Sequence, residues 1–376
     1  MEEKKKLELY VHIPFCVRKC AYCDFVSGPG SSKEQENYVE RLLEEIERAE
    51  RALDYRVVSV FFGGGTPSIL NWELLDRILK ELKRHFLFAP EAEITLEANP
   101  GTVNPEKLSA YRGVGFNRIS FGCQSVHDEE LKRLGRIHTF QDFRESYSMA
   151  RKAGFQNINV DLMSGLPGQT CASFAESLNT IARMEPEHIS VYSLIIEPGT
   201  PFANQKLDLP DEDTEREMYE MTGRILGDYG FLQYEISNYA KPGYACIHNK
   251  GYWERTDYLG FGPSAASLYQ NRRWTNTRDQ KKYMEEDKTG DQIRTEQEIL
   301  SEKDCMEEFM FLGLRMTEGV SRKKFSDLFG KSMESVYGKV LEKYERLGML
   351  AVNGDRVALS RAGISVSNVI LSEFLL

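Results

Sequence analysis

The sequence lacks any long run of apolar residues. A membrane-spanning helix needs about 20 such residues in a row, and no segment approaches that length; residues 1–6, MEEKKK, are charged and lead directly into a predicted strand. A basic excess is also lacking, because 48 Lys and Arg stand against 58 Asp and Glu and give a formal net charge of −10. We therefore expect a cytoplasmic protein that is neither exported nor inserted, and that does not bind nucleic acid.

Paired cysteine spacings are few. The chain has seven cysteines, and Cys123, Cys171, Cys246 and Cys305 stand alone at distances that define no pattern. An odd number suits a reducing compartment better than a secreted disulfide framework. Structural zinc usually takes two pairs of ligands. No second pair is present here, so a zinc site would need His12 as its fourth ligand.

The remaining three cysteines, Cys16, Cys20 and Cys23, lie close together in the string CVRKCAYC. Three thiolates within so short a loop can each bind one iron of a four-iron, four-sulfur cluster. The fourth iron then has no protein ligand and is open to a small molecule. We predict such a cluster, with zinc binding and simple burial as the alternatives.

Short runs of β-branched and aromatic residues recur along the first 230 residues, each followed by an amphipathic helical pattern. The predicted strands are residues 7–15, 56–62, 93–98, 118–123, 157–163 and 188–195. Signals typical of helix starts lie between them: a capping box of Ser32 with Gln35, Asn104 before Pro105, and N-caps at Thr139 and Thr170. Strict alternation predicts a parallel sheet with helical crossovers. Since a closed barrel needs eight units, we expect an α/β fold with an open (β/α)6 partial barrel over residues 1–230.

The alternation ends near Phe231, beyond which aromatic residues are dense. We expect residues 231–295 to form an aromatic-rich connecting module. The highly charged stretch from Lys281 to Lys303 is predicted to be a linker or exposed helix. Residues 296–376 are predicted to form a smaller C-terminal helical domain. Its helices are expected at 305–314, 321–329 and 333–347, followed by a hairpin that turns at Asn353-Gly354. This order is winged-helix-like, and the acidic balance favours a lid or docking role over DNA binding.

Candidate ligand-binding residues lie where the predicted strands end, which is where parallel α/β folds bind ligands. The second strand runs into a glycine turn, residues 63–65, followed by Thr66. Missing side chains let backbone amides approach a ligand there, although the Gly-Lys-Ser/Thr ending of a nucleotide P-loop is absent. Strands three, four and five are predicted to end at Glu97, Gln124 and Asp161. One polar residue at a strand end is often only a cap, but three on one rim predict a site.

The spacing C-x3-C-x2-C, with Tyr22 before the third cysteine, resembles the signature of radical S-adenosylmethionine (radical SAM) proteins. The fuller string at 10–25, YVHIPFCVRKCAYCDF, is similar to the branch that contains oxygen-independent coproporphyrinogen III dehydrogenases and HemW-type heme chaperones. This resemblance covers nearly the whole chain. It implies a partial barrel and a [4Fe-4S] cluster whose open iron binds S-adenosylmethionine, which can be cleaved to a 5′-deoxyadenosyl radical.

The resemblance also implies which residues bind S-adenosylmethionine. They are Tyr10, Tyr22, Gly64, Gly65, Thr66, Glu97, Gln124, Arg136 and Asp161. Arg136 is expected to pair with the methionine carboxylate, because a guanidinium offers a fork of donors. Whether Glu97, Gln124 and Asp161 contact the amino group, the ribose or a second cofactor stays open.

Within that branch, two departures separate this sequence from the dehydrogenases. Phe25 stands where they carry a further cysteine, and only 15 residues precede Cys16, whereas they have an N-terminal extension. The string HNKGYW at 248–253 matches the HNxxYW motif of HemW-type heme chaperones. The sequence therefore favours the chaperones and does not predict coproporphyrinogen dehydrogenase activity.

Heme is accordingly expected at this motif. His248 is the candidate axial ligand, Tyr252 and Trp253 offer flat apolar walls, and Cys246 is either an alternative ligand or a buried small residue. The resemblance implies a chaperone that passes heme to acceptor proteins such as respiratory enzymes, and that contacts membranes only through them. The alternative is an enzyme that oxidatively decarboxylates the propionates of coproporphyrinogen III.

Overall fold

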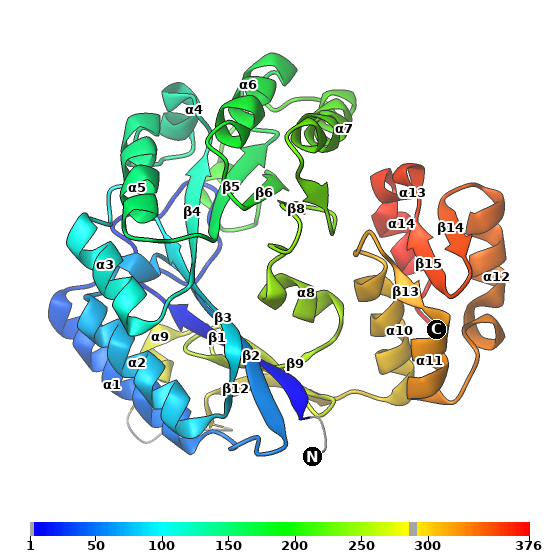
Figure 1. The fold of residues 1–376 in the computed structure, drawn as a ribbon, viewed down its shortest axis with the longest axis horizontal. Coiled ribbons are helices and arrows are strands. Elements are labelled where there is room, and N and C mark those ends of the chain that lie inside the picture. Colours follow the sequence, from blue (N-terminus) through cyan, green and yellow to red (C-terminus); the bar gives the residue numbers. More distant parts are fainter. Residues whose placement is uncertain (1–3, 286–291) are drawn as a thin grey trace.

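A single large sheet organises most of the computed structural model, which describes residues 4–285 and 292–376 (Figure 1). Its strand order is β12-β11-β10-β9-β1-β2-β3-β4-β5-β6-β8-β7. The central strands are β1 (Lys5–Ile13), β2 (Tyr55–Gly64), β3 (Phe88–Ala98), β4 (Arg118–Gln124), β5 (Ile158–Ser164) and β6 (His188–Ser193). Each pairs in parallel with the next in chain order. The predicted (β/α)6 partial barrel is confirmed.

Helices cover the outer face of these strands (Figure 1). They are α1 (Ser32–Arg48), α2 (Trp72–His85), α3 (Pro105–Val114), α4 (Asp128–Arg133), α5 (Phe140–Lys152), α6 (Cys171–Ala182) and α7 (Glu212–Asp228), with the short 3-10 turns η1 (Pro67–Ile69) and η2 (Pro201–Asn204). The predicted N-caps at Asn104, Thr139 and Thr170 are confirmed, because each side chain accepts a hydrogen bond from the first turn of its helix.

The predicted capping box of the first helix is wrong by one residue. Ser31 is the N-cap of α1, and its hydroxyl accepts from the Glu34 amide at 3.3 Å while the Glu34 carboxylate accepts from the Ser31 amide at 2.8 Å. A carboxylate in the first helical turn also meets the positive end of the helix dipole. That charge favours the Ser31 and Glu34 pair over the neutral pair of Ser32 with Gln35.

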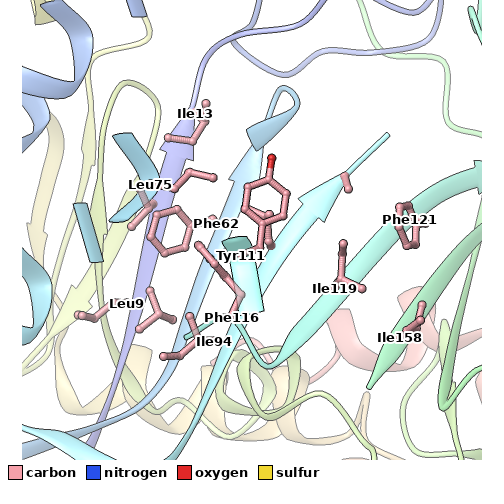
Figure 2. Close-up of a cluster of buried hydrophobic side chains, with 14 of the residues drawn as sticks. Leu9, Ile13, Phe62, Leu75, Ile94, Tyr111, Phe116, Ile119, Phe121 and Ile158 are labelled. Atoms are coloured by element: carbon pink, nitrogen blue, oxygen red, sulfur yellow. The ribbon is translucent and has the colours of Figure 1, made fainter. Parts of the chain in front are cut away.

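The two faces of the barrel strands differ in chemistry. Outward residues such as Leu9, Phe62, Ile119 and Phe121 are fully buried against the helices, as Figure 2 shows. Burial of each such side chain contributes roughly 1.5–3 kcal/mol. Side chains alternate along a strand, so the neighbours of these residues point into the barrel. Many of those inward residues are polar, as Arg118 is on β4, and a polar lumen is what a ligand site needs.

Residues 231–295 do not stand apart from this sheet. Their elements are β7 (Leu232–Gln233), β8 (Asn238–Ala240), α8 (Ile247–Trp253), β9 (Asp257–Phe261), β10 (Ala266–Tyr269), β11 (Arg272–Asn276), α9 (Gln280–Tyr283) and β12, which ends beyond them (Arg294–Ile299). β8 pairs with β6 at one edge of the barrel and β9 pairs with β1 at the other. The connection through α8 therefore crosses the open side of the barrel, where Figure 1 shows it.

The sequence predicted that the charged stretch from Lys281 to Lys303 is a linker or exposed helix, and this prediction is wrong. α9 ends at Tyr283, and β12 adds an antiparallel edge strand to β11. Residues 286–291 of that prediction lie outside the described residues. The domain boundaries at 230 and 295 stay predictions.

The C-terminal part has its own core and a small sheet in the order β13-β15-β14. Its elements are α10 (Glu302–Gly313), β13 (Val320–Ser321), α11 (Arg322–Phe329), α12 (Met333–Arg346), β14 (Leu350–Asn353), β15 (Arg356–Leu359), α13 (Arg361–Ser365) and α14 (Ser367–Ser372). The predicted hairpin is confirmed, with Gly354 at a φ of 57° in its turn. No helix among the described residues has the length and apolarity to cross a membrane.

Candidate functional site

The three clustered cysteines lie on the loop after β1, at the carboxyl ends of the barrel strands. Cys16, Cys20 and Cys23 all line one cavity of about 130 Å³, and their thiols are free. Backbone hydrogen bonds fix the loop from both sides: the Cys16 amide donates to Gly28 at 2.9 Å and the Ala21 amide donates to Leu134 at 3.0 Å. The loop thus presents its thiols to a hollow that the protein leaves open.

The chemistry of this loop fits an iron–sulfur cluster better than zinc. His12 cannot serve as a fourth ligand in this arrangement, because one ring nitrogen bonds Val26 at 2.8 Å and the other bonds Tyr10 at 3.1 Å. Among the described residues, no three His, Cys, Asp or Glu side chains come close enough together to hold a single metal ion. A four-iron cluster needs thiolates that lie further apart than the ligands of a single metal ion, because each thiolate binds a different iron.

Polar donors already surround the thiols. The Thr66 hydroxyl donates to Cys16 Sγ at 3.6 Å, and Arg136 Nη1 donates to Cys20 Sγ at 3.5 Å. Such donors stabilise thiolates and adjust the reduction potential of a bound cluster. Burial raises the pKa of Cys23 above its ordinary value, so coordination by a metal, which takes the thiolate form, would supply the missing driving force for its ionisation.

The glycine turn after β2 forms the floor beside Cys16. A Cβ atom on Gly65 would lie 2.5 Å from the Phe15 carbonyl oxygen and 3.0 Å from Cys16 Sγ. Gly64 has a φ of 106°, which side chains rarely tolerate. Both glycines are therefore required by geometry, because a side chain at Gly65 would clash with Phe15 and one at Gly64 with His12.

A chain of hydrogen bonds links this turn to the next strands. Asn99 donates to Thr66 at 2.7 Å and accepts from Arg136 Nη2 at 2.6 Å, while the same nitrogen of Arg136 donates to the Gly122 carbonyl at 2.7 Å. Arg136 Nε is buried without a partner. Asn99 was not among the predicted site residues, although it follows Glu97 in the string that marks the end of β3.

Glu97, Gln124 and Asp161 line the same cavity. Burial, reinforced by the nearby Asp161, raises the pKa of Glu97 to about 8, and burial also raises the pKa of Asp161. A pKa of about 8 means that Glu97 is mostly protonated at neutral pH. Gln124 has a φ of 69°, a backbone strain of the kind that accumulates at functional sites.

The predicted position of Asp161 at a strand end is wrong. β5 continues to Ser164, and Asp161 lies in its middle, where its carboxylate accepts from Asn159 at 2.7 Å and Ser120 at 3.3 Å. The strand does not stop there because inward polar residues and outward apolar residues alternate through it. Ser120 and Asn159 are thus lumen residues that the prediction from strand ends did not include. A polar residue at every second position of a strand is the sequence signal that indicates them.

A second cavity, of about 530 Å³, continues from the first into the lumen of the barrel. The two cavities share Cys23, Phe25 and Glu97 among their walls, so they form one hollow. Its walls also carry Arg118 and Ser190, which do not line the smaller cavity. The hollow therefore runs from the cysteine loop at the rim to Arg118, the first residue of β4.

His248 and Tyr10 are the two predicted cofactor residues that line neither cavity. His248 is 2% exposed, with Nδ1 bonded to Ser59 at 2.9 Å and Nε2 to the Tyr252 hydroxyl at 3.0 Å. Burial, helped by the charge of Arg118, lowers its pKa to about 3. The ring stacks on Phe61 with 5.1 Å between centroids. His248 is therefore a neutral, packed side chain in this conformation.

The other residues of this motif are also engaged. Tyr252 packs edge-on against Tyr258, and Trp253 lies under the Arg315 guanidinium, 4.5 Å from it. Cys246 is buried and donates to Glu93 at 3.3 Å. Asn249, in contrast, lines the larger cavity. α8 thus contacts the hollow through Asn249, whereas its histidine and aromatic side chains pack against the protein interior.

Known proteins resemble this chain over its whole length. The radical SAM superfamily matches residues 10–181 and the HemN C-terminal domain matches residues 300–366. Heme chaperone HemW of Bacillus subtilis (strain 168) is 37% identical over 97% of this chain and 98% of its own length, and the protein of the same name from Escherichia coli (strain K12) is 36% identical over 98% of each.

A solved structure extends the comparison to the fold. Coproporphyrinogen III oxidase (HemN) from Escherichia coli, described as a radical SAM enzyme, superposes with a TM-score of 0.87 at 26% identity, over 99% of this chain and 90% of its own. The superfamily match implies a [4Fe-4S] cluster and S-adenosylmethionine as cofactors, which agrees with the open thiols. On sequence and fold together, the chain belongs to the HemW heme chaperone family of the radical SAM superfamily.

Proposed function

We propose that the chain binds heme and passes it to acceptor proteins. The observation that carries this proposal is the string HNKGYW at 248–253, which lies on the helix that crosses the open side of the barrel. It occurs in a chain related along its full length to proteins named heme chaperones. Respiratory enzymes are the class of acceptor we expect. The reducing cytoplasm, in which free thiols persist, is the compartment we propose.

We propose further that Cys16, Cys20 and Cys23 hold the cluster. A [4Fe-4S] cluster bound there would, when reduced, supply the electron that cleaves the carbon–sulfur bond of S-adenosylmethionine. Arg136 and Asn99, already bonded to each other, would orient the methionine end of that cofactor, and the raised pKa of Glu97 leaves a group that can release its proton when a cation binds. Gln124 and Asp161 complete the walls around it.

Heme ligation at His248 would require the Tyr252 hydroxyl to move away from the Nε2 atom of the histidine. Its Nε2 is held by Tyr252 of the same helix, so an iron would replace an intrahelical hydrogen bond and leave the Nδ1 bond to Ser59 able to orient the ring. We therefore propose a site that opens on binding, with His248 as the axial donor.

The test is a heme titration of the wild type, His248→Ala and the control His127→Ala, whose side chain lies outside both cavities on the other side of the barrel. We expect His248→Ala to weaken heme binding by about tenfold or more, to shift the Soret band, and to keep its cluster. A wild-type spectrum and affinity in His248→Ala would move the axial role to Cys246 or another group.

The second candidate function is the oxidative decarboxylation of coproporphyrinogen III. The TM-score of 0.87 with HemN favours it. Against it stands Phe25, which is 62% exposed at the mouth of both cavities where the dehydrogenases carry a cysteine. Anaerobic incubation of the reconstituted protein with coproporphyrinogen III, run beside the heme titration, separates the two. Formation of protoporphyrinogen would overturn the chaperone proposal.

A further inference from the structure

Arg118 is a buried cation at the bottom of the hollow. It is the first residue of β4, its side chain is 2% exposed, and it lines the larger cavity. Gln124 ends the same strand at the rim. In the sheet Arg118 lies beside Thr95 of β3, two residues before Glu97, so its side chain is one inward layer below Glu97. Its charge acts on Glu97 and Asp161, which line the cavity of the cysteine loop.

The hydrogen-bonding capacity of this arginine is unused. A guanidinium has five N–H donors, yet among the residues that the structure describes none accepts a hydrogen bond from the Arg118 side chain, and its Nε is buried without a partner. Buried polar groups are almost always bonded, and a charged one left unbonded is costly. A buried arginine of this kind that faces a cavity is typical of a site whose partner comes from outside the chain.

Glu93 balances the charge of Arg118 without bonding it. The closest approach is 3.9 Å, between Arg118 Nε and Glu93 Oε2, which is too long for a hydrogen bond. The other carboxylate oxygen, Oε1, accepts from the Ile247 amide at 3.1 Å and the Cys246 thiol at 3.3 Å at the start of α8. Glu93 is thus directed toward α8, and the fork of the guanidinium stays available.

The walls around Arg118 suit a polar end of a larger ligand. Ser120, Asn159 and Ser190 line the cavity beside it, while Phe61, Met163 and Ile195 add apolar surface. A volume of about 530 Å³ is within the range of pockets that take cofactor-sized molecules. Planar carboxylates match the arginine fork in two parallel hydrogen bonds.

We infer that Arg118 receives a carboxylate of a ligand that enters the lumen from the cysteine rim. Two molecules of the proposed chemistry carry such a group: heme, through its propionates, and S-adenosylmethionine, through its methionine end, which the proposed function instead places at Arg136. Heme as the source rests on the proposed function. The carboxylate receptor itself rests only on the geometry of Arg118 and the cavity.

The experiment compares heme with its dimethyl ester, which has the same ring and iron but no carboxylate. Both are titrated into the full-length wild type, Arg118→Met and the control Arg84→Met, which removes an equally charged arginine from the exposed side of α2. S-adenosylmethionine is titrated into the same three proteins. Thermal melts test whether each variant is folded, because Arg118→Met leaves the buried Glu93 carboxylate without its counter-ion.

A propionate at Arg118 predicts that the wild type and Arg84→Met bind heme at least about tenfold more tightly than the ester, and that this preference disappears in Arg118→Met. If Arg118→Met instead loses about tenfold in S-adenosylmethionine affinity, the carboxylate is that of the methionine end. Arg118→Met with an unchanged ester preference and unchanged S-adenosylmethionine affinity overturns the inference and leaves Arg118 a counter-ion of Glu93.

Two further outcomes keep the inference separate from the proposed function. If the wild type binds no heme, the chaperone proposal fails and the S-adenosylmethionine titration alone decides the role of Arg118. If Arg118→Met does not fold, Arg118→Lys is used in its place, since it keeps the charge beside Glu93 but loses the planar fork. A carboxylate receptor predicts a partial loss of affinity in Arg118→Lys, and full affinity would count against it.

Discussion

The cysteine loop and α8 carry the two most specific motifs of the sequence, but the structure treats them in opposite ways. The loop holds Cys16, Cys20 and Cys23 at an open cavity with their thiols unpaired. α8 holds His248 at 2% exposure with a hydrogen bond on each ring nitrogen. The cysteine site is preformed before its ligand binds, whereas His248 is occupied by contacts within the protein.

This difference separates two ways in which a protein binds a cofactor. A preformed site loses affinity when any wall is disturbed, because its geometry is fixed before binding. A closed site must first break internal contacts, so its apparent affinity is reduced by the fraction of molecules that are open. We expect substitutions at the loop to abolish or weaken binding, and substitutions at α8 to change stability as well.

The largest expected effect is at Cys20. Cys20→Ala removes one of the proposed iron ligands, and we expect the brown iron–sulfur absorbance to be absent after reconstitution, because two remaining thiolates do not hold a four-iron cluster. Iron and sulfide analysis with the visible spectrum measures this.

The matched control for that experiment is Cys171→Ala, since Cys171 begins α6 on the outer side of the barrel and lines neither cavity. It should keep a full cluster. A complete cluster in Cys20→Ala, or stoichiometric zinc in the wild type, would contradict the assignment of the loop. Heme binding at α8, in contrast, should survive in Cys20→Ala if the two sites are as separate as their packing indicates.

The next effect is at Arg136, which joins the loop to the neighbouring strands. Arg136→Ala removes the donors to Cys20 and Asn99, and we expect S-adenosylmethionine affinity to fall by about tenfold to a hundredfold, as for other charged hydrogen bonds. Titration calorimetry on the reconstituted protein provides the measurement. Arg151→Ala, whose side chain bonds Glu187 outside the lumen, is the control, and equal affinities in the two variants would remove Arg136 from the site.

A smaller effect tests whether the loop is preformed. Gly65→Ala places a Cβ atom 2.5 Å from the Phe15 carbonyl, whereas Gly28→Ala, at the other end of the same loop, meets nothing within 4 Å. Overpacking of this kind costs about 1–3 kcal/mol. We expect lower cluster occupancy and weaker S-adenosylmethionine binding in Gly65→Ala but wild-type values in Gly28→Ala. If the two variants behave alike, the loop adapts to its ligand and the contrast with α8 is lost.

The cysteine loop and α8 also differ in how far their structures could be predicted from the sequence. Strand patterns predicted all six barrel units and the cysteine spacing predicted the loop, because both signals depend on residues close together in the chain. The pairing of β9 with β1 and the burial of His248 against Ser59 join residues far apart, and no local pattern carries that information. The role of Arg118 could be predicted only in part. The sequence shows a charged residue in an apolar strand, but it does not show that the arginine lacks a hydrogen-bond partner.

The smallest effect concerns the pH dependence of the closed site. The pKa of His248 is about 3 because of burial and the charge of Arg118, whereas an unfolded histidine has a pKa near 6.5. The unfolded chain therefore binds more protons between these values, so the stability that His248 contributes is complete above about pH 6.5 and is lost as the pH falls toward 3. Glu8 beside it has a raised pKa through burial, which acts in the opposite sense as the pH rises.

His248→Gln keeps a polar group near Ser59 but does not titrate. Between pH 6.5 and 5 we expect it to lose about 1–2 kcal/mol less stability than the wild type, from a slope of about 1.4 kcal/mol per pH unit for one proton. Urea unfolding at both pH values measures the difference, with His127→Gln, a part-exposed histidine outside the lumen, as the control. An identical pH dependence in wild type and His248→Gln would mean that His248 is already accessible to protons, and therefore that α8 opens without heme.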